Sequence, residues 1–294
     1  MHCAYGHLWY IPAKEKEQKI MAMHMRESKI LKRIRNGEVA VTAKCNLADM
    51  RGIEIAAMSG YDAIWIDMEH VPNGFDAVEK AVWAAKIYDC DIITRTSRGG
   101  YSNYIRPLEA DSAAIMVPHL MSLKEAEEIV YYTKFHPIGR RPLDGGNADG
   151  AYCMVDPVEY METANKERIT IVQIEDPEPL ADLEAIAALP GIDMLFFGPA
   201  DFTQGIGAPC DFANPKVAET RKLVAETAKK YGKMAGTTGS PANFEELKAM
   251  GYDLINIVAD VVLLGNGYKN ALESIGRKES VGTSDVEYYK KGDK

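Results

Sequence analysis

Residues 170–197, TIVQIEDPEPLADLEAIAALPGIDMLFF, contain two short apolar runs on either side of a segment with helical periodicity. The runs 170–174 and 194–197 are largely apolar at successive positions rather than at alternate ones, which is typical of strands that are buried on both faces. Between them, the apolar residues of 179–188 recur with the period of a helix. This order predicts a strand, a helix and a second strand parallel to the first.

The same unit recurs along the chain. Eight apolar runs bounded by turn residues alternate with helical segments, and neither a G-x-G-x-x-G motif nor a P-loop follows any of the runs. Eight units favour an α/β fold in one domain, a closed (β/α)8 barrel, over an open doubly wound sheet. The predicted strands are 39–43, 63–66, 91–94, 113–117, 170–174, 194–197, 233–237 and 254–258.

Composition narrows the class of protein. Of 294 residues, 47% are hydrophobic and 26% charged, which is ordinary for a soluble globular protein. The formal net charge of −9, without a basic run, argues against nucleic acid as a partner, and no stretch approaches the roughly 18 apolar residues of a membrane span. Five dispersed cysteines without a CxxC pair argue against a disulfide framework and a thiolate zinc site. We therefore expect a cytoplasmic protein.

Three parts of the chain differ in composition. Residues 1–27 are predicted to be an N-terminal extension, flexible or preceding the natural start, residues 28–275 the barrel, and residues 276–294 a polar tail. Within the barrel, residues 139–149, GRRPLDGGNAD, form an unusually Gly-rich loop. Such a loop in a compact domain is typically functional, so we expect a lid or a contact with a neighbouring subunit.

Polar residues gather where the predicted strands end. In a (β/α)8 barrel the carboxyl ends of the strands meet at one rim, and this rim carries the chemistry. The residues that the sequence places there are Asp67, Glu69, His70, Arg95, His119, Gln173, Glu175, Asp201 and Asp260.

Two of these residues suit a metal ion. Glu175 and Asp201 follow adjacent strands, and two carboxylates with open positions are typical of a site for Mg2+ or Mn2+. In the alternative interpretation, Asp201 caps the helix that follows and Glu175 pairs with a lysine. The Gly-Pro turn before Ala200 opens that helix, whose N terminus suits a substrate carboxylate.

Other rim residues suit proton transfer and charge stabilisation. His70 lies three residues after Asp67, close enough for the carboxylate to orient the imidazole as a general base; the alternative is a surface histidine in a polar turn. Arg95, on an apolar strand, must be paired, either in a structural salt bridge or to stabilise a developing oxyanion. His119 and His136 lack such a context and are interpreted as structural.

With these residues the chain resembles the HpcH/HpaI aldolase family, metal-dependent class II pyruvate aldolases of the citrate lyase/aldolase superfamily. The resemblance covers about residues 28–275. The motifs that carry it are GYD at 60–62, IDMEHVPN at 66–73, Arg95, MVP at 116–118, VQIE at 172–175 and FGPADF at 197–202.

The resemblance implies roles for individual residues. His70 corresponds to the catalytic base, Asp67 to the acid beside it, and Arg95 to the arginine that stabilises an enolate. Glu109 stands in place of an aspartate that raises the pKa of the base. Glu175 and Asp201 correspond to the metal ligands. Substrate contacts are implied for Gln173, Gly198, Pro199, Ala200 and Asp201.

The implied reaction is the retro-aldol cleavage of a 4-hydroxy-2-oxo acid to pyruvate and an aldehyde. It depends on a divalent metal, with Mg2+ expected and Mn2+ or Co2+ as alternatives. A Schiff base on Lys44 or Lys233 is the weaker route. Other readings are a decarboxylase or CoA-thioester lyase with related enolate chemistry, or a non-catalytic binder of 2-oxo acids. The family also implies a homo-oligomer, a hexamer built as a trimer of dimers, with the C-terminal helix exchanged.

Two departures from the family concern the substrate. Lys44 follows the first strand where the family often has tryptophan, and Arg140 lies in an altered Gly-x-Arg-Gly loop. We expect these cations to favour an acidic or polyhydroxylated aldehyde portion. The identity of the aldehyde does not carry over.

Overall fold

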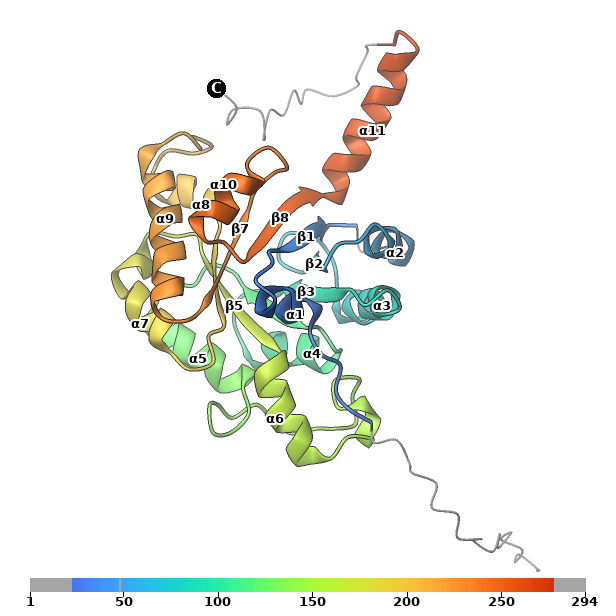
Figure 1. Ribbon diagram of the computed structural model, residues 1–294, viewed down its shortest axis with the longest axis vertical. Coiled ribbons are helices and arrows are strands. Elements are labelled where there is room, and N and C mark those ends of the chain that lie inside the picture. Colours follow the sequence, from blue (N-terminus) through green and yellow to red (C-terminus); the bar gives the residue numbers. More distant parts are fainter. Residues whose placement is uncertain (1–22, 48, 278–294) are drawn as a thin grey trace, which may run out of the picture.

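The computed structural model describes residues 23–47 and 49–277, which form a closed barrel of eight parallel strands (Figure 1). The strands follow sequence order round the barrel, and the last pairs with the first. This confirms the predicted (β/α)8 fold. The strands are β1 (Ala40–Cys45), β2 (Ala63–Asp67), β3 (Asp91–Arg95), β4 (Ala114–Val117), β5 (Ile169–Ile174), β6 (Met194–Phe197), β7 (Met234–Thr238) and β8 (Leu254–Ala259).

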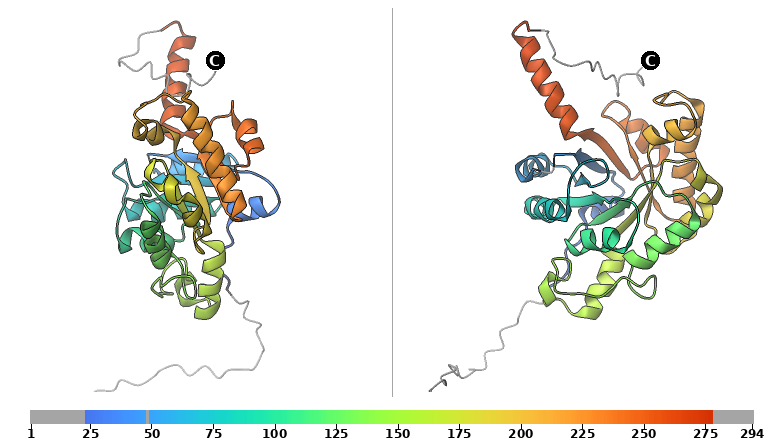
Figure 2. Two further views of the ribbon diagram at one scale, coloured as in Figure 1. Left: turned by 90° about the vertical axis from the view of Figure 1, so that its left-hand side faces the viewer. Right: turned by 180° about the vertical axis from the view of Figure 1, so that it is seen from behind.

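Helices cover the outside of the barrel (Figure 2). Several begin at a side chain that accepts a hydrogen bond from the first turn, as Asp49, Ser122 and Asp156 do. The helices are α1 (Lys29–Arg35), α2 (Met50–Met58), α3 (Phe75–Lys86), α4 (Tyr101–Glu109), α5 (Leu123–Thr133), α6 (Pro157–Glu167), α7 (Leu183–Ala188), α8 (Pro199–Gly205), α9 (Pro215–Lys230), α10 (Phe244–Met250) and α11 (Asp260–Ser274), with short 3-10 turns η1 (Ala151–Cys153) and η2 (Glu178–Asp182).

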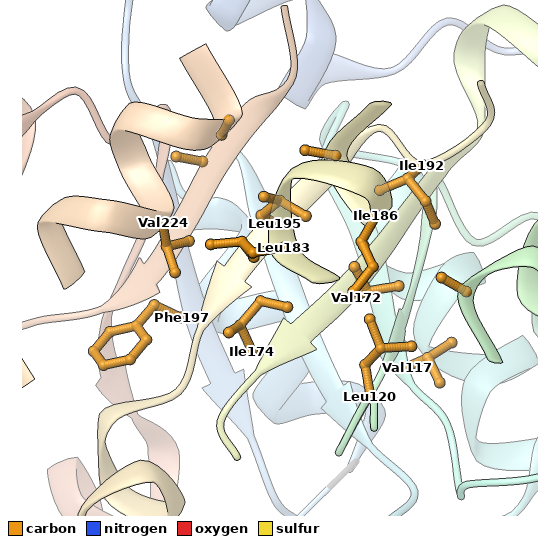
Figure 3. Packing of buried hydrophobic residues seen from close by; sticks show 14 of the residues in the cluster. Val117, Leu120, Val172, Ile174, Leu183, Ile186, Ile192, Leu195, Phe197 and Val224 are labelled. Carbon is orange, nitrogen blue, oxygen red and sulfur yellow. The ribbon is translucent and has the colours of Figure 1, made fainter. Parts of the chain in front are cut away.

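Apolar side chains pack on both faces of the sheet. Inside the barrel, Trp65 and Phe196 meet edge to face with ring centroids 5.7 Å apart. Outside it, residues of β4, β5 and β6 pack against the surrounding helices (Figure 3). Every residue of β2 to β6 is buried, as the continuous apolar runs predict.

The residues before α1 pack against the N-terminal ends of the strands. Met25 is buried against Phe135, Arg26 Nη1 lies 2.5 Å from Asp91 Oδ1, and Ser28 Oγ donates to Asp91 Oδ2 at 2.7 Å. The last residues of the predicted extension therefore contact the barrel. Residues 1–22 of that extension and 278–294 of the predicted tail lie outside the described residues.

The 139–149 loop lies at this same closed end of the barrel. Asp149 accepts hydrogen bonds from Arg141 at 2.8 Å and from Arg168 at 2.5 Å, and Arg168 also binds Asp111 at 2.8 Å. Arg168 directly precedes β5 and Asp111 precedes β4, so the loop is tied to the strand ends opposite to those predicted to carry the site. The expectation of a lid is therefore wrong for this chain's own site. A contact with a neighbouring subunit stays a prediction.

Helix α11 extends away from the barrel (Figures 1 and 2). It has no buried residue, and its exposed side chains include Leu264, Tyr268, Leu272 and Ile275, spaced to lie along one face. Within residues 23–47 and 49–277, no helix combines the length and hydropathy needed to cross a bilayer.

Candidate active site

The carboxyl ends of the strands bring together most of the residues predicted for the site. Asp67 ends β2 and Arg95 ends β3, and the two residues pair in register. Glu175 directly follows β5, and Asp201 lies in the first turn of α8, which follows β6. We call this end of the barrel the mouth.

A buried ion cluster lines the side of the mouth formed by β1 to β3. Arg95 donates from Nε (3.0 Å) and Nη2 (2.5 Å) to the two oxygens of Asp67, and Lys44 Nζ lies 2.9 Å from Asp67 Oδ2. The Arg95 guanidinium and the Lys44 ammonium also lie 4.8 Å and 5.1 Å from the ring centroid of Trp65. The prediction that Arg95 is paired is confirmed.

The ion pairs of Asp67 keep its carboxylate ionised. Burial alone would raise the pKa of Asp67, but Arg95 and Lys44 together outweigh burial and hold that pKa well below its usual range. The carboxylate therefore stays ionised at neutral pH and anchors Arg95. The catalytic role expected for this acidic residue stays a prediction; its side chain contacts Arg95 and Lys44.

His70 contacts Glu69 rather than Asp67. Its Nε2 lies 3.3 Å from Glu69 Oε2, and the same oxygen lies 3.1 Å from Arg95 Nε. Asp67 instead accepts the backbone N–H of Glu69 at 3.0 Å, which turns the chain after β2. The expected Asp67–His70 pair is thus replaced by a Glu69–His70 pair. The His70 ring is largely exposed, so it can exchange protons with solvent.

Glu175 is a buried carboxylate without a strong counter-charge. Its Oε1 accepts the backbone N–H of His119 at 2.9 Å, and its Oε2 accepts Gln173 Nε2 at 2.9 Å. Burial raises the pKa of Glu175 to about 7, and the negative charge of Asp201 adds to the rise. No lysine among the described residues forms an ion pair with Glu175, so the alternative of a lysine partner is not observed.

The neighbours of Glu175 are shaped to hold it. A Cβ at Gly198 would come within 2.5 Å of Glu175 Oε2, so only glycine lets the carboxylate lie against this turn. Pro199 is buried behind it, and Ala200 is exposed at the mouth. The Oε1 atom of Gln173 is buried and has no hydrogen-bond partner within the described residues, which leaves one acceptor free beside Glu175.

The donor set fits a divalent cation that keeps open positions. Gly198 is the N-cap of α8, and no side chain caps this helix, so Asp201 does not serve as its cap. No group of three or more His, Cys, Asp or Glu side chains able to hold a metal occurs in the part of the chain that the structure describes. Glu175 and Asp201 would therefore supply two carboxylates and leave the other positions to water and substrate oxygens, as Mg2+ commonly does.

His119 also lies at the mouth, although the sequence analysis interprets it as structural. It follows β4 in a left-handed backbone conformation with φ of 48°. Its Nδ1 lies 2.8 Å from Asp176 Oδ2, and its Nε2 lies 3.6 Å from Glu69 and 3.9 Å from Glu175. Its place after Val117-Pro118 at a strand end is the signal that identifies it.

Several other candidates lie away from the mouth or have structural roles. The charges that act on Glu109, at the end of α4, are those of Arg141, Asp144, Asp149 and Arg106, so the structure does not bring Glu109 to His70 in this chain. Asp260 accepts the backbone N–H groups of residues 46 and 47, at 3.0 and 3.1 Å. Arg140, the second residue of the 139–149 loop, is exposed.

Comparisons with known proteins identify the family of the chain. The 2-keto-3-deoxy-L-rhamnonate aldolase of Klebsiella pneumoniae is 32% identical over 222 residues, which are 75% of this chain and 81% of that protein. A solved HpcH/HpaI aldolase/citrate lyase family protein from Burkholderia cenocepacia matches with a TM-score of 0.78 and 29% identity, covering 85% of this chain and all of that one. Citrate synthase SbnG matches with a TM-score of 0.77 and 25% identity, and the match covers 86% of this chain and 98% of that one. The family profile of HpcH/HpaI aldolase/citrate lyase matches residues 45–265, and the chain belongs to this family.

Proposed function

We propose that this protein is a class II pyruvate aldolase (EC 4.1.2.-), which cleaves a 4-hydroxy-2-oxo acid to pyruvate and an aldehyde with the help of a divalent metal, most simply Mg2+. The observation that carries the proposal is Glu175, a carboxylate buried at the mouth, acted on by Asp201 and without a lysine or arginine ion pair among the described residues. The names of the relatives support a 2-oxo-3-deoxy acid as the type of substrate.

Glu175 and Asp201 would hold a divalent cation, which would supply positive charge to polarise the 2-oxo group of the substrate. Gln173 and Gly198 hold Glu175 in place for that role, as their contacts with its carboxylate indicate.

The chain's own residues account for the movement of charge. His70 takes the proton from the C4 hydroxyl, the C3–C4 bond breaks, the aldehyde forms at C4, and the electron pair passes to the pyruvyl half as an enolate. Pyruvate forms when C3 of the enolate takes up a proton, and His70 returns to its neutral form by giving up the proton that it took. Arg95 donates to the enolate oxygen. Its Nη1 forms no hydrogen bond within the described residues, and Asp67 fixes the rest of the guanidinium. Glu69 orients His70.

The Schiff-base alternative finds less support. Lys233 Nζ donates to the carbonyls of Leu189 and Ile192, which precede β6 and so lie at the closed end of the barrel. Lys44 is at the mouth, but it is paired with Asp67, and an ammonium group has no lone pair with which to attack a carbonyl.

Pyruvate release from a panel of 4-hydroxy-2-oxo acids tests the function. We expect release by the wild type, a large loss in His70→Ala with pyruvate binding retained, and no covalent adduct after borohydride treatment in the presence of pyruvate. An adduct on lysine would contradict the metal-dependent mechanism. Activity only on a CoA thioester, or binding of 2-oxo acids without turnover, would favour one of the two rival functions.

We further propose that the protein is a homo-oligomer in which α11 packs on a partner subunit. The exposed apolar face of Leu264, Tyr268, Leu272 and Ile275 supports this, because an isolated helix gains stability chiefly by burying such a face. Light scattering after size exclusion should show an oligomer for the wild type and a smaller species for Leu264→Asp. A wild-type monomer would contradict the proposal.

A further inference from the structure

One side of the mouth carries the two acidic residues Glu175 and Asp201, and the opposite side carries the cation Lys44. Glu175 and Asp201 follow β5 and β6, whereas Lys44 belongs to β1. In a closed ring of eight strands in sequence order, β1 and β5 lie on opposite sides. A substrate whose 2-oxo acid end lies at Glu175 and Asp201 therefore extends its aldehyde half toward Lys44.

Lys44 is the most accessible charged group of the Lys44–Asp67–Arg95 cluster. The side chain of Asp67 is 0% exposed and that of Arg95 5%, whereas that of Lys44 is 19% exposed. Of the three charged side chains, that of Lys44 is therefore the one that a substrate in the mouth reaches most readily.

The ion pairs of the cluster do not use all the hydrogen-bond donors of Lys44. Lys44 Nζ and Arg95 Nη2 both contact Asp67 Oδ2, so two cations lie close together and repel each other. Glu69 Oε2, 3.1 Å from Arg95 Nε, supplies Arg95 with a second negative charge. Lys44, by contrast, has only Asp67 as an ionic partner among the described residues. An ammonium group has three N–H donors, and Asp67 also has to accept both nitrogens of Arg95.

We propose that Lys44 determines substrate specificity by binding a carboxylate on the aldehyde half of the substrate. This inference rests on the proposed function, because it takes the 2-oxo acid end to lie at Glu175 and Asp201. It also distinguishes between Lys44 and Arg140, the two cations that the sequence analysis names for this role. Arg140 lies in the 139–149 loop at the closed end of the barrel, so of these two cations only Lys44 lies at the mouth of its own chain.

Binding of ligands that cannot be cleaved tests the inference apart from catalysis. The ligands are 2-oxohexanedioate against 2-oxohexanoate, and 2-oxoheptanedioate against 2-oxoheptanoate, pairs that differ only in the terminal carboxylate and lack the 4-hydroxyl group. Calorimetric titrations in buffer with Mg2+ would compare the wild type with Lys44→Met, Lys44→Arg and the control Arg140→Met. Thermal melting would confirm that each variant is folded.

We expect the wild type to prefer the dicarboxylate of at least one pair, and Lys44→Met to lose that preference by about tenfold or more, the effect of one charge-assisted hydrogen bond. Lys44→Arg, which keeps the charge, and Arg140→Met should retain the preference. A wild type without preference, a preference that survives in Lys44→Met, or no binding of any of these ligands would overturn the inference.

A pyruvate-release assay on the same preparations separates the two claims. Release of pyruvate by a protein without the dicarboxylate preference refutes the inference and leaves the proposed function standing. A Lys44-dependent preference in a protein that releases no pyruvate supports Lys44 as the binding residue and refutes the proposed function.

Discussion

Two buried carboxylates at opposite ends of the barrel, Glu175 at the mouth and Asp149 at the closed end, are equally buried and differ in their electrostatics. Each is 2% exposed. Burial alone would raise the pKa of Asp149, but Arg168 and Arg141 together outweigh burial and lower that pKa. No arginine or lysine among the described residues forms an ion pair with Glu175, and burial raises its pKa to about 7.

The difference separates a structural charge from a functional one. At the closed end, charged side chains tie the 139–149 loop to the strand ends. Removing one member of this cluster would leave its partners buried with less opposite charge. At the mouth, the His119 backbone N–H and the charges of His119 and Arg95 act on Glu175, but they do not outweigh burial. Burial alone therefore does not distinguish the two carboxylates, whereas the strength of their ion pairs does, and the proposed function assigns a bound cation to the weakly paired one.

The largest expected effect is on stability, from removing the charge of Asp149 at the closed end of the barrel. In Asp149→Asn we expect the free energy of unfolding to fall by about 3–5 kcal/mol, because Arg141 stays buried without its counter-charge and Arg168 keeps only Asp111 as an ion-pair partner. Urea unfolding followed by circular dichroism measures it. The matched control is Asp144→Asn, an exposed residue of the same loop, with an expected loss below about 1 kcal/mol. Equal losses in the two variants would contradict the comparison.

Arg95 tests whether a residue in a buried ion pair can also be functional, because it pairs with Asp67 and lies at the mouth. In Arg95→Met we expect pyruvate release to fall by about 10²–10³-fold, since a positioned donor to a developing oxyanion is lost. Arg98→Met is the control, because Arg98 pairs with Glu125 at the surface. Steady-state kinetics of both variants would check this. A fall of similar size in Arg98→Met would show that Arg95 has no special role.

A smaller effect, on stability, is expected for Glu175→Gln in the presence of EDTA. The folded state binds the Glu175 proton more tightly than the unfolded state does, so deprotonation destabilises the wild type as the pH rises from about 4.5 to about 7. The glutamine variant has no proton to lose. Its stability relative to the wild type should therefore increase across this range and level off above it.

Thermal melts over a series of pH values measure this difference. Added Mg2+ should stabilise the wild type above pH 7 and leave Glu175→Gln unchanged. A constant difference between the two proteins at every pH would contradict the raised pKa of Glu175.

The fold was largely predictable from the sequence, because strands buried on both faces leave continuous apolar runs such as 170–174 and 194–197. The C-terminal helix α11 was expected only through the resemblance to the family. Its apolar face is not buried by any of the described residues, and a partner subunit, which we propose to cover it, leaves no local pattern in the sequence of one chain.

The site was predictable as a set of positions and less so as a set of pairs. The strand-end rule placed Asp67, Arg95, Glu175 and Asp201 at the mouth, as observed. It did not determine that His70 pairs with Glu69, or that His119 donates its backbone N–H to Glu175. Such pairings depend on how each loop turns after its strand, and spacing along the chain does not report that geometry.

The most direct test of the central claim is pyruvate release from the panel of 4-hydroxy-2-oxo acids before and after EDTA, followed by addition of Mg2+, Mn2+ or Co2+. The account predicts release that EDTA abolishes and a divalent cation restores in the wild type, with no restoration in Glu175→Gln. Release that is unaffected by EDTA would contradict it, and would remove Glu175 and Asp201 from the role of metal ligands.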